Sequence, residues 1–312
     1  MFLKHLINPK PSAILVFIVF CVVFCLFPLV QFKTDAVFTH SHLHPIIVIL
    51  LAITIPLFLS TGLNNIIYEK NIIRKENIVI GFVFILISCS FVNTVELWAS
   101  SFLLLFFFNF LLESYQKAMP LSQFYNASLI LSGLTFVYPN LICLVFLLII
   151  NGINYSNLSW RIIFTSFLGL ITPYFFYFVF VYIMEMPFYL PAFFDFSQVN
   201  FSNVNNWHIS KTSWISTILL IILFSFFELF MWLYKKSIRS RRTFMTIFWF
   251  FIISILIANY SSWEHFYFSL IPLAIIIGNY FVYTKNRKIA NMLFTLLVIS
   301  SFYYKYMILF NV

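Results

Sequence analysis

The chain has 312 residues, of which 62% are hydrophobic and only 9% are charged, and its mean hydropathy is +1.00. A soluble domain could not keep so much apolar surface away from water, so this composition excludes an ordinary globular protein. The net charge of +9 would indicate nucleic-acid binding in a soluble protein. Here the basic residues lie in short segments between apolar runs, where they signal membrane topology, and we exclude nucleic acid as a partner.

The apolar runs recur along the whole chain, and several reach the length of about 18 residues that crosses roughly 30 Å of hydrocarbon. The sequence therefore predicts an all-α, polytopic transmembrane helix bundle that forms one membrane domain over 1–312. About eleven spans are expected, at 12–31, 44–63, 78–95, 97–113, 121–137, 139–153, 162–184, 213–234, 243–258, 265–284 and 289–310. Pro139 separates the fifth run from the sixth, so these are either two short helices or a re-entrant hairpin.

Basic residues predict the orientation of these spans. If the N-terminus is cytoplasmic, 15 of the 18 Lys and Arg residues fall on the cytoplasmic side. Only Lys33, Lys211 and Lys305 fall on the other side. The same orientation places most of the acids and five of the six histidines on or near the outer face. One interpretation is that these residues only solvate the outer loops, and the other is a site that opens outward.

The first predicted outer loop, 31–43, holds the clearest candidates for chemistry. Asp35 lies in this loop, and it is followed by His40, His42 and His44. Alternate spacing puts three imidazoles on one side of an extended segment, where they could bind a divalent metal beside a carboxylate. Loop histidines that bind no metal are the commoner case.

Two further segments hold candidate substrate-binding residues. Glu96 lies in a short turn near membrane depth, where a carboxylate is either functional or stabilises the start of the next helix through its dipole. Glu264 and His265 precede the tenth predicted span, where a cationic imidazole could bind a lipid phosphate or simply be solvated. Glu228 is expected to pair with the basic run that follows it, and we assign it no chemistry.

No nucleotide-binding motif is present, because the six glycines form neither a P-loop nor a G-x-G-x-x-G pattern. The sequence therefore does not identify a cofactor. If the protein is an enzyme, its activated substrate is expected to be carried on a lipid.

The middle of the chain resembles an uncharacterised family of multi-pass inner-membrane proteins from Gram-negative bacteria. The resemblance covers about residues 60 to 185, and a second, weaker similarity covers His265 to Tyr280. It lies in Gly62-Leu63-Asn64-Asn65, Leu121-Ser122-Gln123, Phe136-Val137-Tyr138-Pro139, Leu158-Ser159-Trp160-Arg161 and Gly169-Leu170-Ile171-Thr172-Pro173-Tyr174. It implies a bacterial inner-membrane location and no particular activity.

More remotely, the layout is similar to that of the GT-C glycosyltransferases, which use polyprenyl-linked sugar donors. That resemblance would make Asp35 the general base for an acceptor hydroxyl and His265 a contact to the donor phosphate. The paired acids of many members are absent here. Three functions therefore stay open: glycosyl transfer at the outer face, a non-enzymatic subunit or scaffold of a cell-envelope assembly, and a transporter or flippase. The expected partners are membrane lipids, a polyprenyl-phosphate-linked substrate or other envelope proteins.

Overall fold

The computed structural model describes residues 2–31, 45–88, 95–189, 191, 209–260 and 263–310. Every regular element in this part of the chain is a helix, as the sequence predicts. Each of the eleven predicted runs coincides with helical structure, although several boundaries move. By contact density the chain divides into two units, which are described separately below.

Five of the described helical segments are long and apolar enough to cross a membrane. They are Glu96–Glu113, Trp160–Ile183, Ile209–Met231, Ile238–Asn259 and His265–Tyr283. Since about 18 apolar residues cover the hydrocarbon core, these segments indicate an integral membrane protein. The total of eleven spans and the cytoplasmic N-terminus stay predictions.

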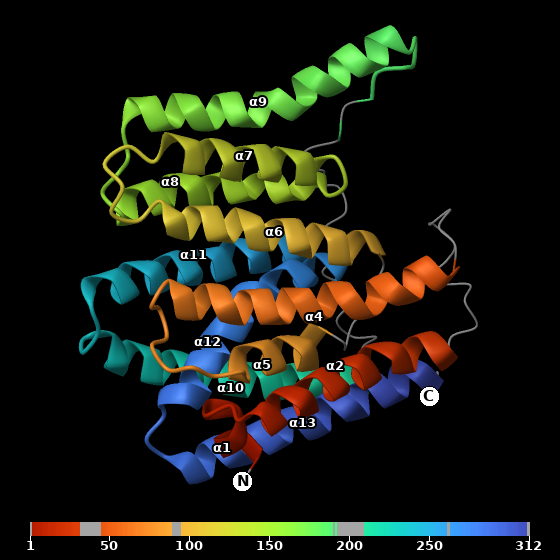
Figure 1. Cartoon of the computed structure of the whole chain (residues 1–312), viewed down its shortest axis with the longest axis vertical. Coiled ribbons are helices and arrows are strands. Elements are labelled where there is room, and N and C mark those ends of the chain that lie inside the picture. The colour runs from red at the N-terminus through yellow and green to blue at the C-terminus, as the bar shows by residue number, and fades with distance from the viewer. Residues whose placement is uncertain are drawn as a thin grey trace. The chain divides into compact units, whose positions relative to one another are not determined.

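Unit 1 comprises 1–99, 200–236 and 270–312. Its helices are α1 (Phe2–Ile7), α2 (Pro11–Gln31), α4 (Pro45–Glu69), α5 (Val79–Ser88), α10 (Ile209–Leu233), α12 (Leu270–Tyr283) and α13 (Arg287–Phe310). The core is built on α5 and α12, which pack on each other (Figure 1), and every residue of α5 is buried. Around them, α4 packs on α5, and α10 packs on both α12 and α13.

Two glycines allow the helices of this core to approach closely. A Cβ on Gly81 would lie 2.9 Å from the backbone carbonyl oxygen of Ser60, and one on Gly278 would lie 2.7 Å from a side-chain carbon of Ile80. Membrane helices associate mainly through such close packing, because lipid tails are as apolar as the helices. Gly81 thus sets the α4–α5 contact and Gly278 the α5–α12 contact.

Unit 2 comprises 100–199 and 237–269. It contains most of α6 (Val95–Glu113), then α7 (Leu121–Thr135), the 3-10 helix η1 (Pro139–Leu144), α8 (Val145–Asn154), α9 (Trp160–Ile183), α11 (Ile238–Tyr260) and the 3-10 helix η4 (Trp263–Ser269). Within this unit α9 packs on α7, and α11 packs on α8 and η4 (Figure 1). Asn151 of α8 joins three helices, because it donates to Leu111 and Ser114 and accepts from Thr246.

The segment around Pro139 is a helical hairpin made of α7, η1 and α8, with Pro139 in the first turn of η1. The 15 residues of α7 extend only about 22 Å, less than the thickness of the hydrocarbon core.

The predicted start of the ninth span, at residue 243, was five residues too late. Helix α11 begins at Ile238, so Arg239, Arg241 and Arg242 lie in its first two turns rather than in a loop. The hydroxyl of Ser237 accepts from the backbone N–H of Ser240, as a helix N-cap does. This cap was missed because the prediction followed only the apolar residues.

Candidate functional site: a basic cavity in unit 1

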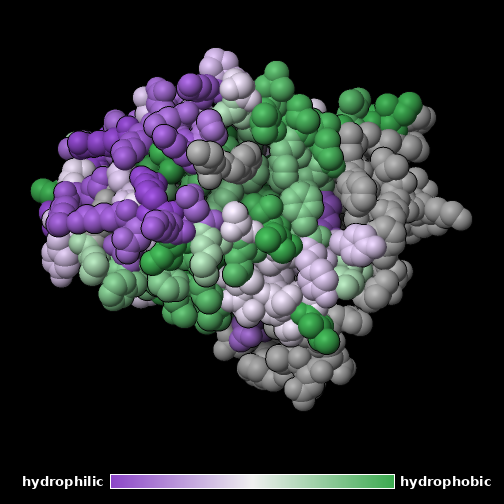
Figure 2. Space-filling view, turned by 90° about the horizontal axis from the view of Figure 1, so that it is seen from below, coloured by the Kyte–Doolittle hydropathy of each residue, from purple (hydrophilic) through white to green (hydrophobic). Residues whose placement is uncertain are grey.

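Four basic segments meet at one end of unit 1. The N–H of Ile78 donates to the carbonyl of Leu6, and the N–H of Arg74 donates to the hydroxyl of Tyr283. Figure 2 shows hydrophilic residues gathered at one end of the face it views, with hydrophobic surface beyond them. The segments 2–10, 69–77, 228–236 and 284–288 hold ten Lys and Arg residues against three glutamates. We call this region the basic end.

The ring of Tyr283 lies at the centre of the basic end. The Nζ atom of Lys236 is 4.0 Å from the centroid of this ring, and that of Lys75 is 5.5 Å away. Ammonium groups at such distances are attracted by an aromatic face. The hydroxyl of the same ring accepts from the backbone N–H of Arg74 at 3.1 Å. Tyr283 therefore holds cations from two separate segments next to each other.

The loop that carries Arg74 and Lys75 is anchored to unit 1. Asn64 of α4 donates to the carbonyl of Asn77 at 2.5 Å, and the Asn77 side chain donates to the carbonyl of Lys75 at 2.8 Å. Ile72 and Ile73 are buried on the other side of the loop. These contacts fix the loop, so a ligand that bound there would order little further backbone.

The two adjacent asparagines of α4 allow this anchoring to be tested. Replacing Asn64 with Ala removes the hydrogen bond to Asn77, and we expect the free energy of unfolding to fall by about 1 kcal/mol. Asn65 donates to Glu69 at 2.7 Å on the exposed face, so Asn65→Ala should change it by less than about 0.5 kcal/mol. Titration of both purified variants with sodium dodecyl sulfate, followed by circular dichroism, measures the difference. Equal stabilities of the two variants would show that Asn64 does not anchor the loop.

Electrostatics sets Lys236 apart from the other cations. Burial, and after it repulsion from Arg74 and Lys75, together lower the pKa of this lysine to about 8. Lys236 follows the end of α10 and so lies outside the membrane-spanning segment. An anion beside it would favour the charged form and raise this pKa again.

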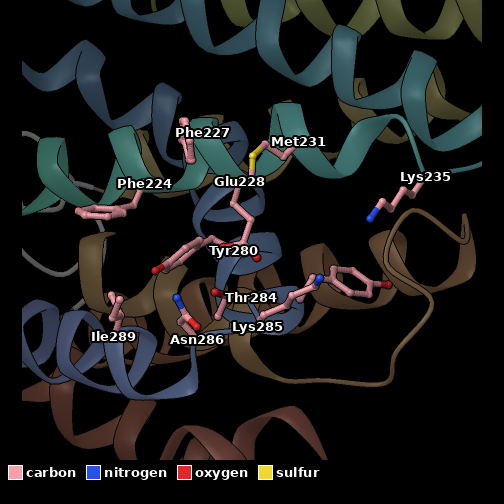
Figure 3. A pocket seen from close by; sticks show the side chains of 11 residues that line it. Phe224, Phe227, Glu228, Met231, Lys235, Tyr280, Thr284, Lys285, Asn286 and Ile289 are labelled. Atoms are coloured by element: carbon pink, nitrogen blue, oxygen red, sulfur yellow. The ribbon is translucent and has the colours of Figure 1, made fainter.

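A cavity of about 400 Å³ opens beside Tyr283, between α10, the end of α12 and the start of α13. Figure 3 shows Glu228 pointing from α10 toward α12, with Lys235 at the far end of the cavity. The apolar part of the wall is formed by Phe224, Phe227, Met231 and Ile289. The polar part is formed by Glu228, Lys235, Tyr280, Tyr283, Thr284, Lys285 and Asn286.

The turn between α12 and α13 is fixed by an arginine. The guanidinium of Arg287 donates to the carbonyls of Phe281 and Val282, which are among the last carbonyls of α12. A cation at the C-terminus of a helix also interacts favourably with the helix dipole. This cap holds Lys285 and Asn286 against the cavity.

The predicted outer-face residues are only partly described by the structure. Asp35, His40, His42 and His44 lie outside the described residues, as does the side chain of Glu264. The catalytic and metal-binding hypotheses for these residues therefore stay predictions. Glu96 is exposed in the first turn of α6, the position where the helix dipole favours a carboxylate.

His265 is buried in unit 2, whereas Glu96 belongs to unit 1. The imidazole packs edge-on against the rings of Tyr138 and Phe268, with centroids 5.5 and 6.1 Å apart. The imidazole of His265 is therefore not simply solvated, and that alternative is wrong. A role of His265 in binding phosphate stays a prediction.

The sequence interpretation missed the basic cavity. Glu228 was expected only to pair with nearby cations, but it lines the cavity together with residues more than 50 positions away in the chain. The one local signal for this site was the Asn64-Asn65 pair followed by a charged loop. This pair is among the residues on which the family resemblance rests.

The comparisons with known proteins place the chain in a family. No curated protein and no solved structure matches it. A family model described as "Family of unknown function (DUF6427)" matches residues 1–312, the whole of the chain. The chain therefore belongs to the DUF6427 family.

Proposed function

We propose that this protein binds the phosphate of an anionic lipid at the basic end of unit 1. The observation that carries the proposal is the cavity beside Tyr283, which joins an apolar wall to a cationic rim. A lipid has the same two parts, an apolar tail and a charged headgroup. Clusters of Lys and Arg next to membrane helices attract anionic headgroups by about 1 kcal/mol per cation.

The position of the acid within the cavity supports one orientation of the lipid. Glu228 precedes Lys235 by seven residues, or about 10 Å along α10. Its carboxylate disfavours a phosphate in the inner part of the cavity, so the phosphate lies at the rim beside Lys235, Lys285 and Tyr283, where Lys75 and Lys236 lie over the tyrosine ring. The tail then runs past Phe224 and Phe227 toward the bilayer.

The proposal includes the location and topology of the protein. We propose that it lies in the bacterial inner membrane with the basic end toward the cytoplasm, the side on which cationic loops of membrane proteins accumulate. The phosphate would then be that of a lipid in the cytoplasmic leaflet.

Titration of the purified protein in a neutral detergent tests this function. Dioctanoyl phosphatidylglycerol should bind at least about tenfold more tightly than dioctanoyl phosphatidylcholine, because its headgroup is anionic rather than zwitterionic. The two lipids share acyl chains, so the tail contributes equally to both. Equal affinities would contradict the proposal.

A further inference from the structure

The arrangement of cations at the rim goes beyond what a singly charged headgroup requires. Lys75 and Lys236 both lie over the ring of Tyr283, and Arg74 is adjacent in the same anchored loop. Like charges held this close repel each other, and an anion between them relieves that repulsion. A doubly charged anion relieves more of it than a singly charged one.

Building on the proposed function, we infer that the basic end selects a lipid phosphomonoester, a phosphate with a single ester bond to its lipid, over a phosphodiester headgroup. A phosphomonoester carries about −1.5 to −2 charges at pH 7 and presents three terminal oxygens. A phosphodiester carries one charge on two such oxygens. Arg74, Lys75 and Lys236 lie close enough to repel one another beside Tyr283, and their three positive charges exceed what a singly charged headgroup balances.

The carboxylates of the basic end leave this charge excess in place. Glu69 accepts from Asn65, and Glu76 accepts from the hydroxyl of Tyr68 at 3.1 Å. Glu228 lies about two helical turns inside the cavity from Lys235. Ten cations against three carboxylates in these segments leave an excess that suits a dianion.

The apolar wall makes the expected ligand a lipid rather than a free phosphate. Phe224, Phe227 and Met231 lie along one side of α10, and Ile289 faces them from α13. Burial of a hydrocarbon chain against such a wall is favourable in proportion to the apolar area removed from water. The cavity wall therefore recognises the tail, and the cations around Tyr283 at its rim recognise the phosphate.

The inference is tested by titration of the purified protein with two further ligands. Dioctanoyl phosphatidate, a monoester, should bind at least about tenfold more tightly than dioctanoyl phosphatidylglycerol, a diester with the same tails. Glycerol 3-phosphate, which lacks the tails, should bind at least about a hundredfold more weakly than phosphatidate. Equal binding of monoester and diester, both tighter than phosphatidylcholine, would overturn this inference and leave the proposed function standing. Equal binding of all three lipids would overturn both. Binding of glycerol 3-phosphate as tight as that of phosphatidate would overturn the assignment of a lipid.

The pH dependence of phosphatidate affinity distinguishes a direct role of Lys236 from a merely structural one, which would not change with its protonation. Arg74, Lys75 and Tyr283 are among the groups that face Lys236. Because its pKa is about 8 in the free protein and rises when an anion binds, binding above pH 8 must take up a proton. Phosphatidate affinity should therefore fall about tenfold between pH 7.5 and 9.5, a range in which the phosphate stays doubly charged. In Lys236→Arg, whose side chain stays charged, affinity should be flat over this range. A flat wild-type profile would overturn the assignment of Lys236 to the phosphate.

Discussion

A double variant in which Lys75 and Lys236 are both replaced by Met is expected to bind anionic lipid about 30-fold more weakly than the wild type. Each cation near a membrane surface contributes about 1 kcal/mol to the attraction of an anionic headgroup, and 1.4 kcal/mol corresponds to a tenfold change in affinity. These two ammonium groups lie within 5.5 Å of the Tyr283 ring centroid, beside the cavity that Tyr283 lines. Titration of the purified variant with dioctanoyl phosphatidylglycerol measures the loss.

A second pair of lysines at the same end provides the matched control. Lys10 and Lys288 are exposed, whereas Lys75 and Lys236 lie over the ring of Tyr283. Replacing both with Met removes the same net charge, so a diffuse electrostatic attraction would weaken to the same extent. If binding is localised beside Tyr283, the control should lose less than about threefold. Equal losses in the two double variants would show that the cations act only through their total charge.

Replacing Gly169 with Leu is expected to lower the free energy of unfolding of unit 2 by about 3 kcal/mol. A Cβ at this position would lie 2.7 Å from the backbone carbonyl oxygen of Tyr125 and would overlap the hydroxyl of Ser128. Backbone atoms of α7 cannot move aside as a flexible side chain can, and overpacking of this kind costs about 1–3 kcal/mol or more. Hydrogen bonds across the same α7–α9 interface, such as that from Ser132 to the carbonyl of Leu170, would weaken as well.

Gly133 on α7 provides the control for this substitution. A Cβ at Gly133 would meet no atom within 4 Å, so Leu can be accommodated there. Because Leu favours helix more than Gly by nearly 1 kcal/mol, Gly133→Leu should leave unfolding unchanged or shift it to higher denaturant. Titration with sodium dodecyl sulfate, followed by circular dichroism, compares the two variants. A Gly169→Leu variant as stable as the wild type would show that α9 does not depend on close packing against α7.

Local sequence patterns predicted the helices well, because a long apolar run favours a helix, which satisfies every backbone hydrogen bond within one segment. The run at 12–31 became α2, Pro11–Gln31, and that at 289–310 became α13, Arg287–Phe310. The predicted helix starts were too late where polar residues belong to the first turn of the helix or cap it. Helix α11 begins at its Ser237 cap, and α10 begins at Ile209, four residues before its predicted start.

The candidate site could not be predicted in the same way, because it depends on packing between distant segments. The cavity requires Glu228, Tyr280 and Lys285 to face each other, and no spacing in the sequence encodes that arrangement. The search for chemistry favoured acids and histidines at the outer face. The basic residues were interpreted as topology signals and as ion-pair partners of Glu228, although Tyr283 brings two of them, Lys75 and Lys236, together beside the cavity.

Photo-crosslinking tests the binding of an anionic lipid at the basic end most directly. The probe is a short-chain phosphatidylglycerol with a diazirine in its acyl chain, added to the purified protein and followed by mass-spectrometric mapping of labelled peptides. We predict that labelling concentrates in peptides containing Phe224 to Met231 and Ile289, and that excess unlabelled phosphatidylglycerol, but not phosphatidylcholine, removes it. The exposed aromatic residues of α9, such as Phe175 and Phe176, report general contact with lipid. Labelling of α9 and of the cavity to the same extent, with no difference between the two competitors, would contradict the account.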